Sequence, residues 1–253
     1  MKRKPAPMVP PCAAARLTRA TSYPFEIPAG SFLFRDGRAG PLEADDLDRL
    51  TRGRVPVIAC GSNQSPAQLA RKYDGVAGAV TIPVIRGWLA DFDAVYSAHI
   101  TTYGSVAATL QHRPGTTVAL SVLWLTDEQL VRMHATEAPG ENYAYTRLDR
   151  LQLRLDGGPV LATAWAYTSL HGCLVDAGEM AALAAMPARG RTLPAHHQPE
   201  MLRRVHGRLA PAMDFDAFVL DNIADAAARR HRIGRLRADA APFAWRHIHV
   251  ETI

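Results

Sequence analysis

The chain has 253 residues, of which 48% are hydrophobic and 21% are charged. These proportions are ordinary for a globular protein and exclude a chain that is disordered throughout. No stretch approaches the roughly 18 consecutive apolar residues of a membrane-spanning helix. The N-terminus begins with basic residues, but prolines interrupt it, so we do not expect a secretory signal.

The formal net charge of +5 is concentrated at one end of the chain. Residues 1–20 contain five basic side chains and no acidic one, whereas the other 233 residues carry 24 of each. We therefore predict a disordered basic arm over residues 1–20 on a neutral body. Such an arm binds polyanions weakly, and we do not expect nucleic acid to be the main partner.

The three cysteines, Cys12, Cys60 and Cys173, are few and widely spaced. They form no CxxC pair and no disulfide framework. A reducing, cytoplasmic location fits this usage best.

Patterns of apolar residues and turn signals predict strands in the first part of the chain and helices in the last. This order favours an α+β fold over a doubly wound one. The expected elements are a short helix at 42–50, a buried strand at 55–60, a helix at 66–72, strands at 104–110 and 117–125 around a turn at Pro114–Gly115, a helix ending near 137, a hairpin of 148–155 with 160–167, and helices at 199–209 and from 214 onward.

A glycine-containing bend, Gly61-Ser62-Asn63, follows the buried strand directly. Glycine permits a sharp turn in which successive backbone N–H groups converge on one point. Such a loop can bind a carboxylate or a developing oxyanion. The same three residues are also ordinary turn composition, which is the alternative interpretation.

The helix that ends near Glu137 begins with a capping box, Thr126 to Gln129, and must stop before Pro139. Its buried face consists of residues three and four positions apart, namely Leu130, Met133, His134 and Glu137. Partial burial and the negative end of the helix dipole both disfavour a charged carboxylate at this position. A carboxyl group in such a place suits proton transfer.

Less specific interpretations of the same residues remain open. Glu137 could pair with an arginine such as Arg147, and His134 on the same helix face is more typical of a hydrogen-bonded core histidine than of a catalytic partner. Ser62 has no GxSxG elbow around it, and Cys60 is expected to be packed in the strand. The bend and Glu137 together indicate an acyl-transfer site without a side-chain nucleophile.

These residues resemble the gamma-glutamylcyclotransferase-like family. Cys60-Gly61-Ser62-Asn63 is similar to its Tyr-Gly-Ser-Asn signature, and the later strands, the helix ending in Thr136-Glu137, a following tyrosine, the hairpin and Leu193-Pro194 occur in the family's order. The resemblance covers about residues 55–210. The departures are Cys60 in place of the tyrosine and Gln64 in place of an apolar residue.

The resemblance implies a small mixed β-barrel flanked by helices. The N-terminal extension at 21–54 and the C-terminal helical extension at 211–253 have no counterpart in the family, and we expect extra helical segments at both ends of the fold. It implies an enzyme without a cofactor that cyclises a γ-glutamyl amine to 5-oxoproline and releases the amine, a lyase or transferase reaction. Glu137 matches the catalytic glutamate. The residues that would bind substrate are Gly61, Ser62, Asn63, Gln64 and Tyr143, with Tyr145 as a rival for the last.

Three other functions are weighed against this one. The first is a non-catalytic member of the same fold that binds a small molecule. The second is a metal-dependent hydrolase using His196, His197, His247 and His249, although no HExxH or comparable spacing is present. The third is nucleic-acid binding by the arm. We expect a small γ-glutamyl partner and no metal or membrane, and leave homodimer formation open.

Overall fold

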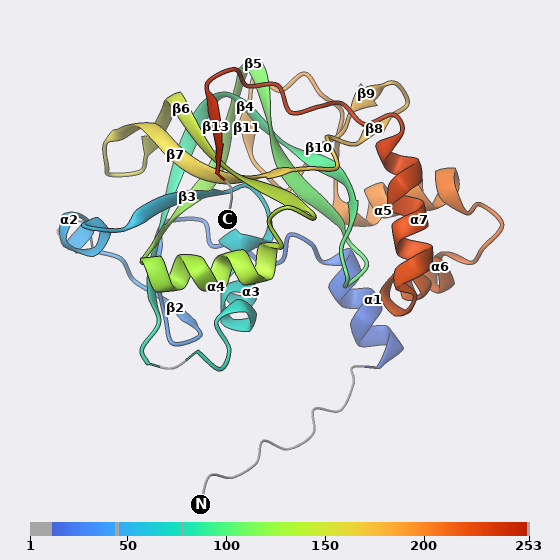
Figure 1. The fold of residues 1–253 in the computed structure, drawn as a ribbon, viewed down its shortest axis with the longest axis horizontal. Helices are drawn as coiled ribbons and strands as arrows, with labels where there is room; N and C mark the ends of the chain where they lie inside the picture. Colours follow the sequence, from blue (N-terminus) through green and yellow to red (C-terminus); the bar gives the residue numbers. More distant parts are fainter. Residues whose placement is uncertain (1–11, 44–45, 77, 252–253) are drawn as a thin grey trace, which may run out of the picture.

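The computed structural model describes residues 12–43, 46–76 and 78–251, and at its centre is a closed five-stranded β-barrel (Figure 1). The strands pair in the order β4–β5–β3–β7–β6, and β6 pairs again with β4 to close the barrel. The β3–β7 pair is parallel and the others are antiparallel. The barrel strands are β3 (Val55–Ala59), β4 (Thr81–Ile100), β5 (Val106–Leu125), β6 (Tyr143–Leu155) and β7 (Val160–Ser169).

Shorter strands extend or edge this barrel. The β1–β2 hairpin adds to β4, and β13 adds to β6 near the C-terminus. The remaining strands are β1 (Phe32–Arg35), β2 (Arg38–Gly40), β8 (Val175–Asp176), β9 (Glu179–Met180), β10 (Ala182–Leu183), β11 (Ala188–Arg189), β12 (Ala195–His196) and β13 (Ile248–Glu251).

Helices cover two sides of the barrel (Figure 1). Helices α3 and α4 lie together below it, and α1 joins α5, α6 and α7 on another side. The predicted α+β class, a small mixed barrel flanked by helices with additional terminal helices, is confirmed. The helices are α1 (Ala13–Thr21), α2 (Leu47–Thr51), α3 (Pro66–Lys72), α4 (Asp127–Glu137), α5 (Gln198–Leu209), α6 (Phe215–Ala224) and α7 (Ala226–Arg237), with a 3₁₀ turn η2 at Ser62–Gln64.

Helix α1 occupies residues that were expected to belong to the basic arm. Residues 1–11 lie outside the described part, but Ala13–Thr21 are helical. Ala20 is fully buried, and Leu17 packs against the main core cluster. Ser105 Oγ also donates to the Ala20 carbonyl at 2.8 Å. The prediction of disorder is wrong for residues 13–20, because it relied on the basic charge of the segment and overlooked its short apolar face.

Strand β5 runs through Pro114–Gly115, where a turn was predicted. The pairing with β4 shifts register at this point, so that one residue of β4, Asp91, lies opposite several extra residues of β5. Gly115 has φ +81° and donates its N–H to Asp91 Oδ1 at 2.8 Å. The turn signal therefore marks an irregularity inside a paired strand, and two predicted strands form one.

Most of the other predicted elements are present with small changes at their ends. These are the strand at 55, the helix at Pro66, the capped helix to Glu137, the hairpin and the last helices. The short helix expected at 42–50 begins later, at Leu47. The division of the chain at residues 54 and 210 stays a prediction.

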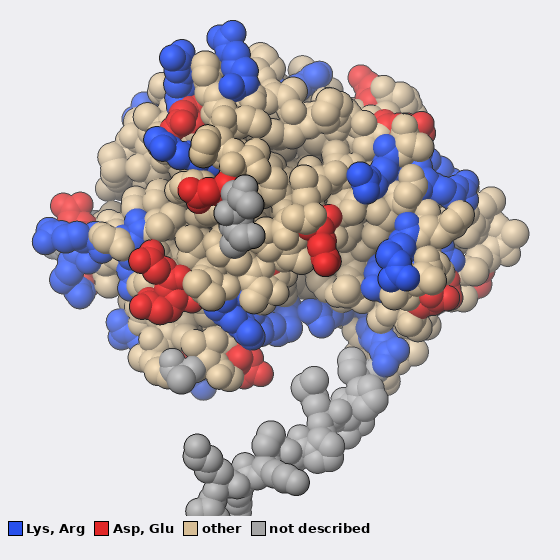
Figure 2. Space-filling model, in the orientation of Figure 1, with Lys and Arg blue, Asp and Glu red and all other residues tan. Residues whose placement is uncertain are grey.

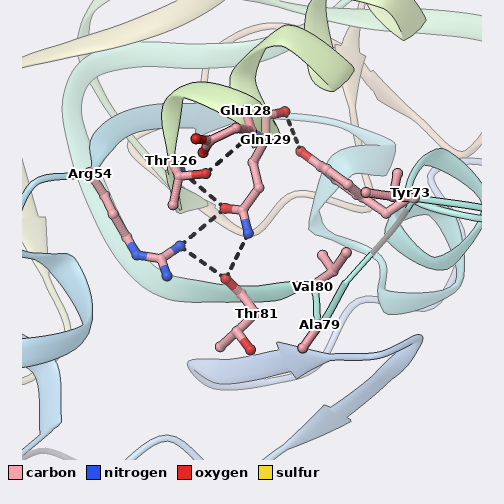
Figure 3. A pocket seen from close by; sticks show the side chains of 9 residues that line it. Arg54, Tyr73, Ala79, Val80, Thr81, Thr126, Glu128 and Gln129 are labelled. Carbon is pink, nitrogen blue, oxygen red and sulfur yellow. Dashed lines mark hydrogen bonds between the residues drawn. The ribbon is translucent and has the colours of Figure 1, made fainter.

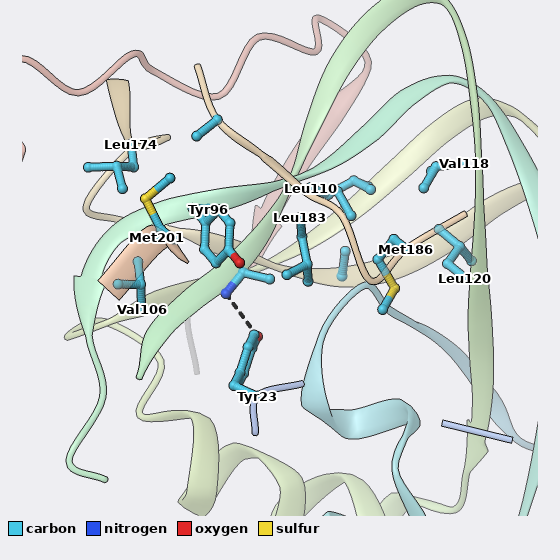
Figure 4. Close-up of a cluster of buried hydrophobic side chains, with 14 of the residues drawn as sticks. Tyr23, Tyr96, Val106, Leu110, Val118, Leu120, Leu174, Leu183, Met186 and Met201 are labelled. Carbon is cyan, nitrogen blue, oxygen red and sulfur yellow. Dashed lines mark hydrogen bonds between the residues drawn. The ribbon is translucent and has the colours of Figure 1, made fainter. Parts of the chain in front are cut away.

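The largest buried cluster fills the barrel and continues under α5 and α6 (Figure 4). Tyr96 is fully buried there, and its hydroxyl donates to the His196 carbonyl at 3.0 Å. A second cluster lies between the barrel and helices α3 and α4, and it includes Leu69 and Met133. Within the described ranges, each helix is too short or too polar to cross a lipid bilayer.

Candidate active site

The loop after β3 and the last turn of α4 meet at one place below the barrel. The capping box begins α4 as predicted, because Gln129 N donates to Thr126 Oγ1 and Thr126 N donates to Gln129 Oε1. Glu137 is the last residue of the helix. On the other side, β3 ends at Ala59, and the chain bends through Gly61 into the 3₁₀ turn.

Glu137 and Asn63 are in direct contact across this junction. Asn63 Nδ2 donates to Glu137 Oε1 at 2.8 Å, and the Glu137 side chain is 12% exposed. Among the described residues, Asn63 Oδ1 is buried without a hydrogen-bond partner, and no hydrogen bond reaches Glu137 Oε2. The site therefore holds a free amide acceptor and a free carboxylate oxygen beside the bend.

Lys72 at the end of α3 is the basic partner of Glu137. Its ammonium contacts Oε1 of Glu137 in a short ion pair, and it donates to Thr136 Oγ1 at 2.9 Å. The Lys72 side chain is 7% exposed. The suggested alternative partner, Arg147, pairs with Asp149 instead.

Two adjoining cavities share this junction. The larger has a volume of about 330 Å³ and the smaller about 50 Å³. Both are lined by Tyr23, Ser62, Glu137 and Tyr143. Lys72 lines only the larger cavity, whereas Gly61 and Asn63 line only the smaller one. The two together offer a polar chamber with one carboxylate at the junction.

The bend itself presents backbone groups to the smaller cavity. Gln64 N bonds the Gly61 carbonyl and Ser65 N bonds the Ser62 carbonyl. Within the described residues, the N–H groups of Ser62 and Asn63 donate no hydrogen bond, as is usual for the first residues of a helical turn. The sequence predicted such donors near Gly61 and Ser62, and the same bend offers them at Ser62 and Asn63.

Gln64 does not line either cavity. It is 2% exposed, its amide nitrogen reaches the Gly61 carbonyl, and its oxygen accepts from Ser121 Oγ at 3.1 Å. The side chain therefore supports the loop from beneath, and the geometry offers no support for substrate contact by Gln64.

Of the two candidate tyrosines, Tyr143 faces the cavities and Tyr145 does not. Tyr145 is stacked on Trp165 at 4.4 Å between ring centroids. Burial raises the pKa of the Tyr143 hydroxyl well above its ordinary value, and the nearby Glu137 acts in the same direction. Tyr143 is therefore a protonated hydroxyl at the wall of the site.

A histidine pair forms part of the larger cavity's surroundings. His99 lines the cavity and stacks on His171 at 4.7 Å. Burial lowers the pKa of His99 to about 3, and His171 adds to the shift. His99 is therefore a neutral ring at neutral pH. The sequence offered no interpretation of it.

The other histidines considered do not join the site. His134 Nδ1 is 2.8 Å from the Tyr167 hydroxyl, which is the hydrogen-bonded role considered for it. His249 lies on the exposed strand β13, and His196 contacts Glu200 at 2.6 Å. In the described part of the chain, no group of three or more His, Cys, Asp or Glu side chains is placed to hold a metal ion.

A cavity of about 470 Å³ near the start of α4 is larger, but its central polar groups bond to one another (Figure 3). Arg54 Nη1 donates to Gln129 Oε1 and to the Thr81 carbonyl, and Gln129 Nε2 donates to the same carbonyl. This network ties the helix cap to β4 and is structural.

On the face of the molecule seen in Figure 1, acidic and basic side chains are interspersed (Figure 2).

Comparisons with known proteins provide only a distant likeness in structure. No family model and no curated protein match the chain. A search of solved structures finds one described as "Gamma-glutamyl cyclotransferase", 16% identical, with a TM-score of 0.28. The match covers 55% of this chain and 66% of that one. Because this likeness is so weak, any function for the chain has to be argued from the geometry of the site.

Proposed function

We propose that the two cavities form the active site of a cyclotransferase-type enzyme, which cyclises a γ-glutamyl amine to 5-oxoproline and releases the amine. One observation carries the proposal: the Glu137 carboxylate lies 2.8 Å from Asn63 beside the Gly61 bend, with one oxygen free. An acid/base group and oxyanion donors thus share one enclosed space, as acyl transfer without a side-chain nucleophile requires.

The free groups match the charged end of such a substrate. Asn63 Oδ1 and Glu137 Oε2 are acceptors without a protein donor among the described residues, and the substrate α-ammonium supplies three N–H donors. Binding the ammonium here would place the α-nitrogen near the bend. The buried Asn63 oxygen would then gain the partner that a buried polar group ordinarily has.

The reaction proceeds by intramolecular attack. Glu137 takes one proton from the α-ammonium, and the freed amine attacks the γ-carbonyl carbon. The new C–N bond closes a five-membered ring, while the carbonyl oxygen becomes anionic near the N–H groups of Ser62 and Asn63. The carbonyl then re-forms, and the bond to the leaving nitrogen breaks as Glu137 gives the proton to that nitrogen. The ring nitrogen still carries one proton too many, and the same carboxylate transfers it to the released amine, which departs as an ammonium. No water is consumed, and the tethered attack gives a high effective molarity.

Mass spectrometry tests this proposal. The purified chain is incubated with a panel of γ-glutamyl amines and γ-glutamyl amino acids, and release of 5-oxoproline is measured against a protein-free control. Release above the spontaneous rate from at least one compound is expected. Rates equal to the control across the panel would contradict the proposal.

A second candidate is a binding protein that uses the same chamber without catalysis. The ion pair from Lys72 to Glu137 favours it, because the ammonium already occupies one oxygen of the only carboxylate proposed to move a proton. Calorimetry would then show that γ-glutamyl compounds bind while no lactam is formed.

A further inference from the structure

Tyr23 belongs to a segment far from the rest of the site in sequence, yet its side chain reaches the centre of the site. The residue is 6% exposed and lines both cavities, together with Ser62 and Glu137. The expected active-site region began at residue 55, so this segment adds a side chain that the sequence did not predict.

Two hydrogen bonds from the start of β5 fix the segment. Ser105 Oγ donates to the Ala20 carbonyl at 2.8 Å, and Ala108 N–H donates to the Tyr23 hydroxyl oxygen at 2.8 Å (Figure 4). Because Ala108 is the donor in the second bond, the Tyr23 O–H proton is not used there. Within the described residues, it has no acceptor.

The hydroxyl lies directly against the bend. A Cβ added to Gly61 would come within 2.3 Å of the Tyr23 hydroxyl oxygen, closer than any side chain permits. Gly61 therefore does more than allow a turn, since its lack of a side chain lets the tyrosine oxygen approach the loop. The free O–H and the free N–H groups of Ser62 and Asn63 border the same small cavity.

We propose that Tyr23 is a catalytic residue, whose O–H donates a hydrogen bond to the γ-carbonyl oxygen as that oxygen becomes anionic. This inference rests on the proposed function. No bond to Tyr23 forms or breaks, and its proton stays on the phenol, so the step adds only a third donor beside the two backbone N–H groups.

The surroundings keep this donor protonated. Burial raises the pKa of Tyr23 well above its ordinary value, and the nearby Tyr103 and Tyr143 act in the same direction. The group thus remains a neutral donor over the range in which an enzyme would be assayed. A neutral donor held in an enclosed place needs no rearrangement as charge develops.

The test compares Tyr23→Phe with Tyr96→Phe on the full chain. Both remove a buried hydroxyl that bonds to the backbone, but the hydroxyl of Tyr96 bonds to the His196 carbonyl in the barrel core. For Tyr23→Phe we expect kcat to fall by about 10²- to 10³-fold with KM little changed, the scale for one lost oxyanion donor. For Tyr96→Phe we expect kcat within about twofold of the wild type.

The outcomes separate the two proposals. If the wild-type chain releases 5-oxoproline but Tyr23→Phe retains the kcat of Tyr96→Phe, the role of Tyr23 is overturned and the proposed function stands. If the wild-type chain releases none, both are overturned.

If Tyr23→Phe does not fold, 3-fluorotyrosine at position 23 replaces it in the test. Its more acidic hydroxyl is a stronger hydrogen-bond donor, so a donor role predicts that kcat rises above the wild-type value while KM is little changed. A kcat equal to that of the wild type overturns the role.

Discussion

Lys72 and Glu137 form a buried ion pair that joins the end of α3 to the end of α4. Their side chains are only 7% and 12% exposed. Both donors to the carboxylate, Lys72 and Asn63, reach the same oxygen, Oε1. This arrangement fixes the Glu137 side chain and leaves Oε2 for a ligand.

Removal of one partner should therefore destabilise the fold. Lys72→Met leaves a buried carboxylate without its counter-charge, and we expect a loss of about 3 kcal/mol in the free energy of unfolding. The double variant Lys72→Met/Glu137→Gln should recover much of this loss, because neither charge is then buried alone. Urea unfolding of the wild type, the two single variants and the double variant measures the coupling between the two residues.

Arg132→Met provides the matched control for this cycle. Arg132 also links the two helices, by donating to the Lys72 carbonyl at 2.5 Å, but it does not contact the carboxylate. Its loss should not be rescued by Glu137→Gln. Equal rescue of both variants would show that the Lys72–Glu137 pair has no specific coupling.

Substitution of Gly61 by alanine should disturb the site through Tyr23. The new methyl would overlap the Tyr23 hydroxyl and press on the Ala108 side chain at 3.2 Å. Overpacking of this kind costs about 1–3 kcal/mol. Gly207→Ala, in the last turn of α5 with open space around it, should instead stabilise by up to roughly 0.5–1 kcal/mol. Thermal unfolding of both variants measures these effects. A Gly61→Ala variant as stable as the wild type would contradict the close contact with Tyr23.

Stability should fall in mild acid because of His99. The pKa of this ring is lowered from 6.5 to about 3 by burial. Between these pH values the unfolded chain binds a proton that the folded chain does not. The free energy of unfolding is therefore highest above pH 6.5 and decreases as the pH falls below it. The loss is up to about 1.4 kcal/mol per pH unit.

Urea unfolding at pH 7 and pH 5 measures this slope. His99→Asn should reduce it, while the exposed His249→Asn should leave it as in the wild type. His171, whose pKa burial also lowers, should preserve part of the slope. An unchanged slope in His99→Asn would argue against the buried neutral ring.

The cysteines should differ sharply in reactivity. Burial raises the pKa of both Cys60 and Cys173 to about 12, whereas Cys12 is exposed. Because the thiolate is the reactive form, a thiol reagent at pH 8 should label one cysteine per folded chain and three after unfolding. Cys60 is half-buried and lines the smaller cavity, so its rapid labelling, identified by peptide mapping, would contradict the raised pKa of its thiol.

Local patterns predicted much of the fold and the central part of the site. The capping box, the proline stop and the apolar spacing of α4 sufficed to place Glu137 at a helix end on a partly buried face. The bend at Gly61–Asn63 followed from a β-branched run that ends in glycine. In both cases neighbouring residues determine the outcome, so the sequence contains the information.

The contacts between distant segments could not be predicted in this way. Tyr23 meets Ala108 across 85 positions, and no periodicity relates the two. Lys72 did carry a signal: it is the one lysine outside the first four residues in a chain with 26 arginines. A lone lysine among arginines is a reason to examine that position for a site.

The most direct measurement is the rate of 5-oxoproline release by Glu137→Gln on the best γ-glutamyl substrate of the wild-type chain. Glutamine retains the shape and the contact with Asn63 but cannot exchange a proton. We expect a folded protein with a kcat lower by about 10²-fold or more, the scale for loss of an acid/base group. Turnover equal to that of the wild type would contradict the role of Glu137.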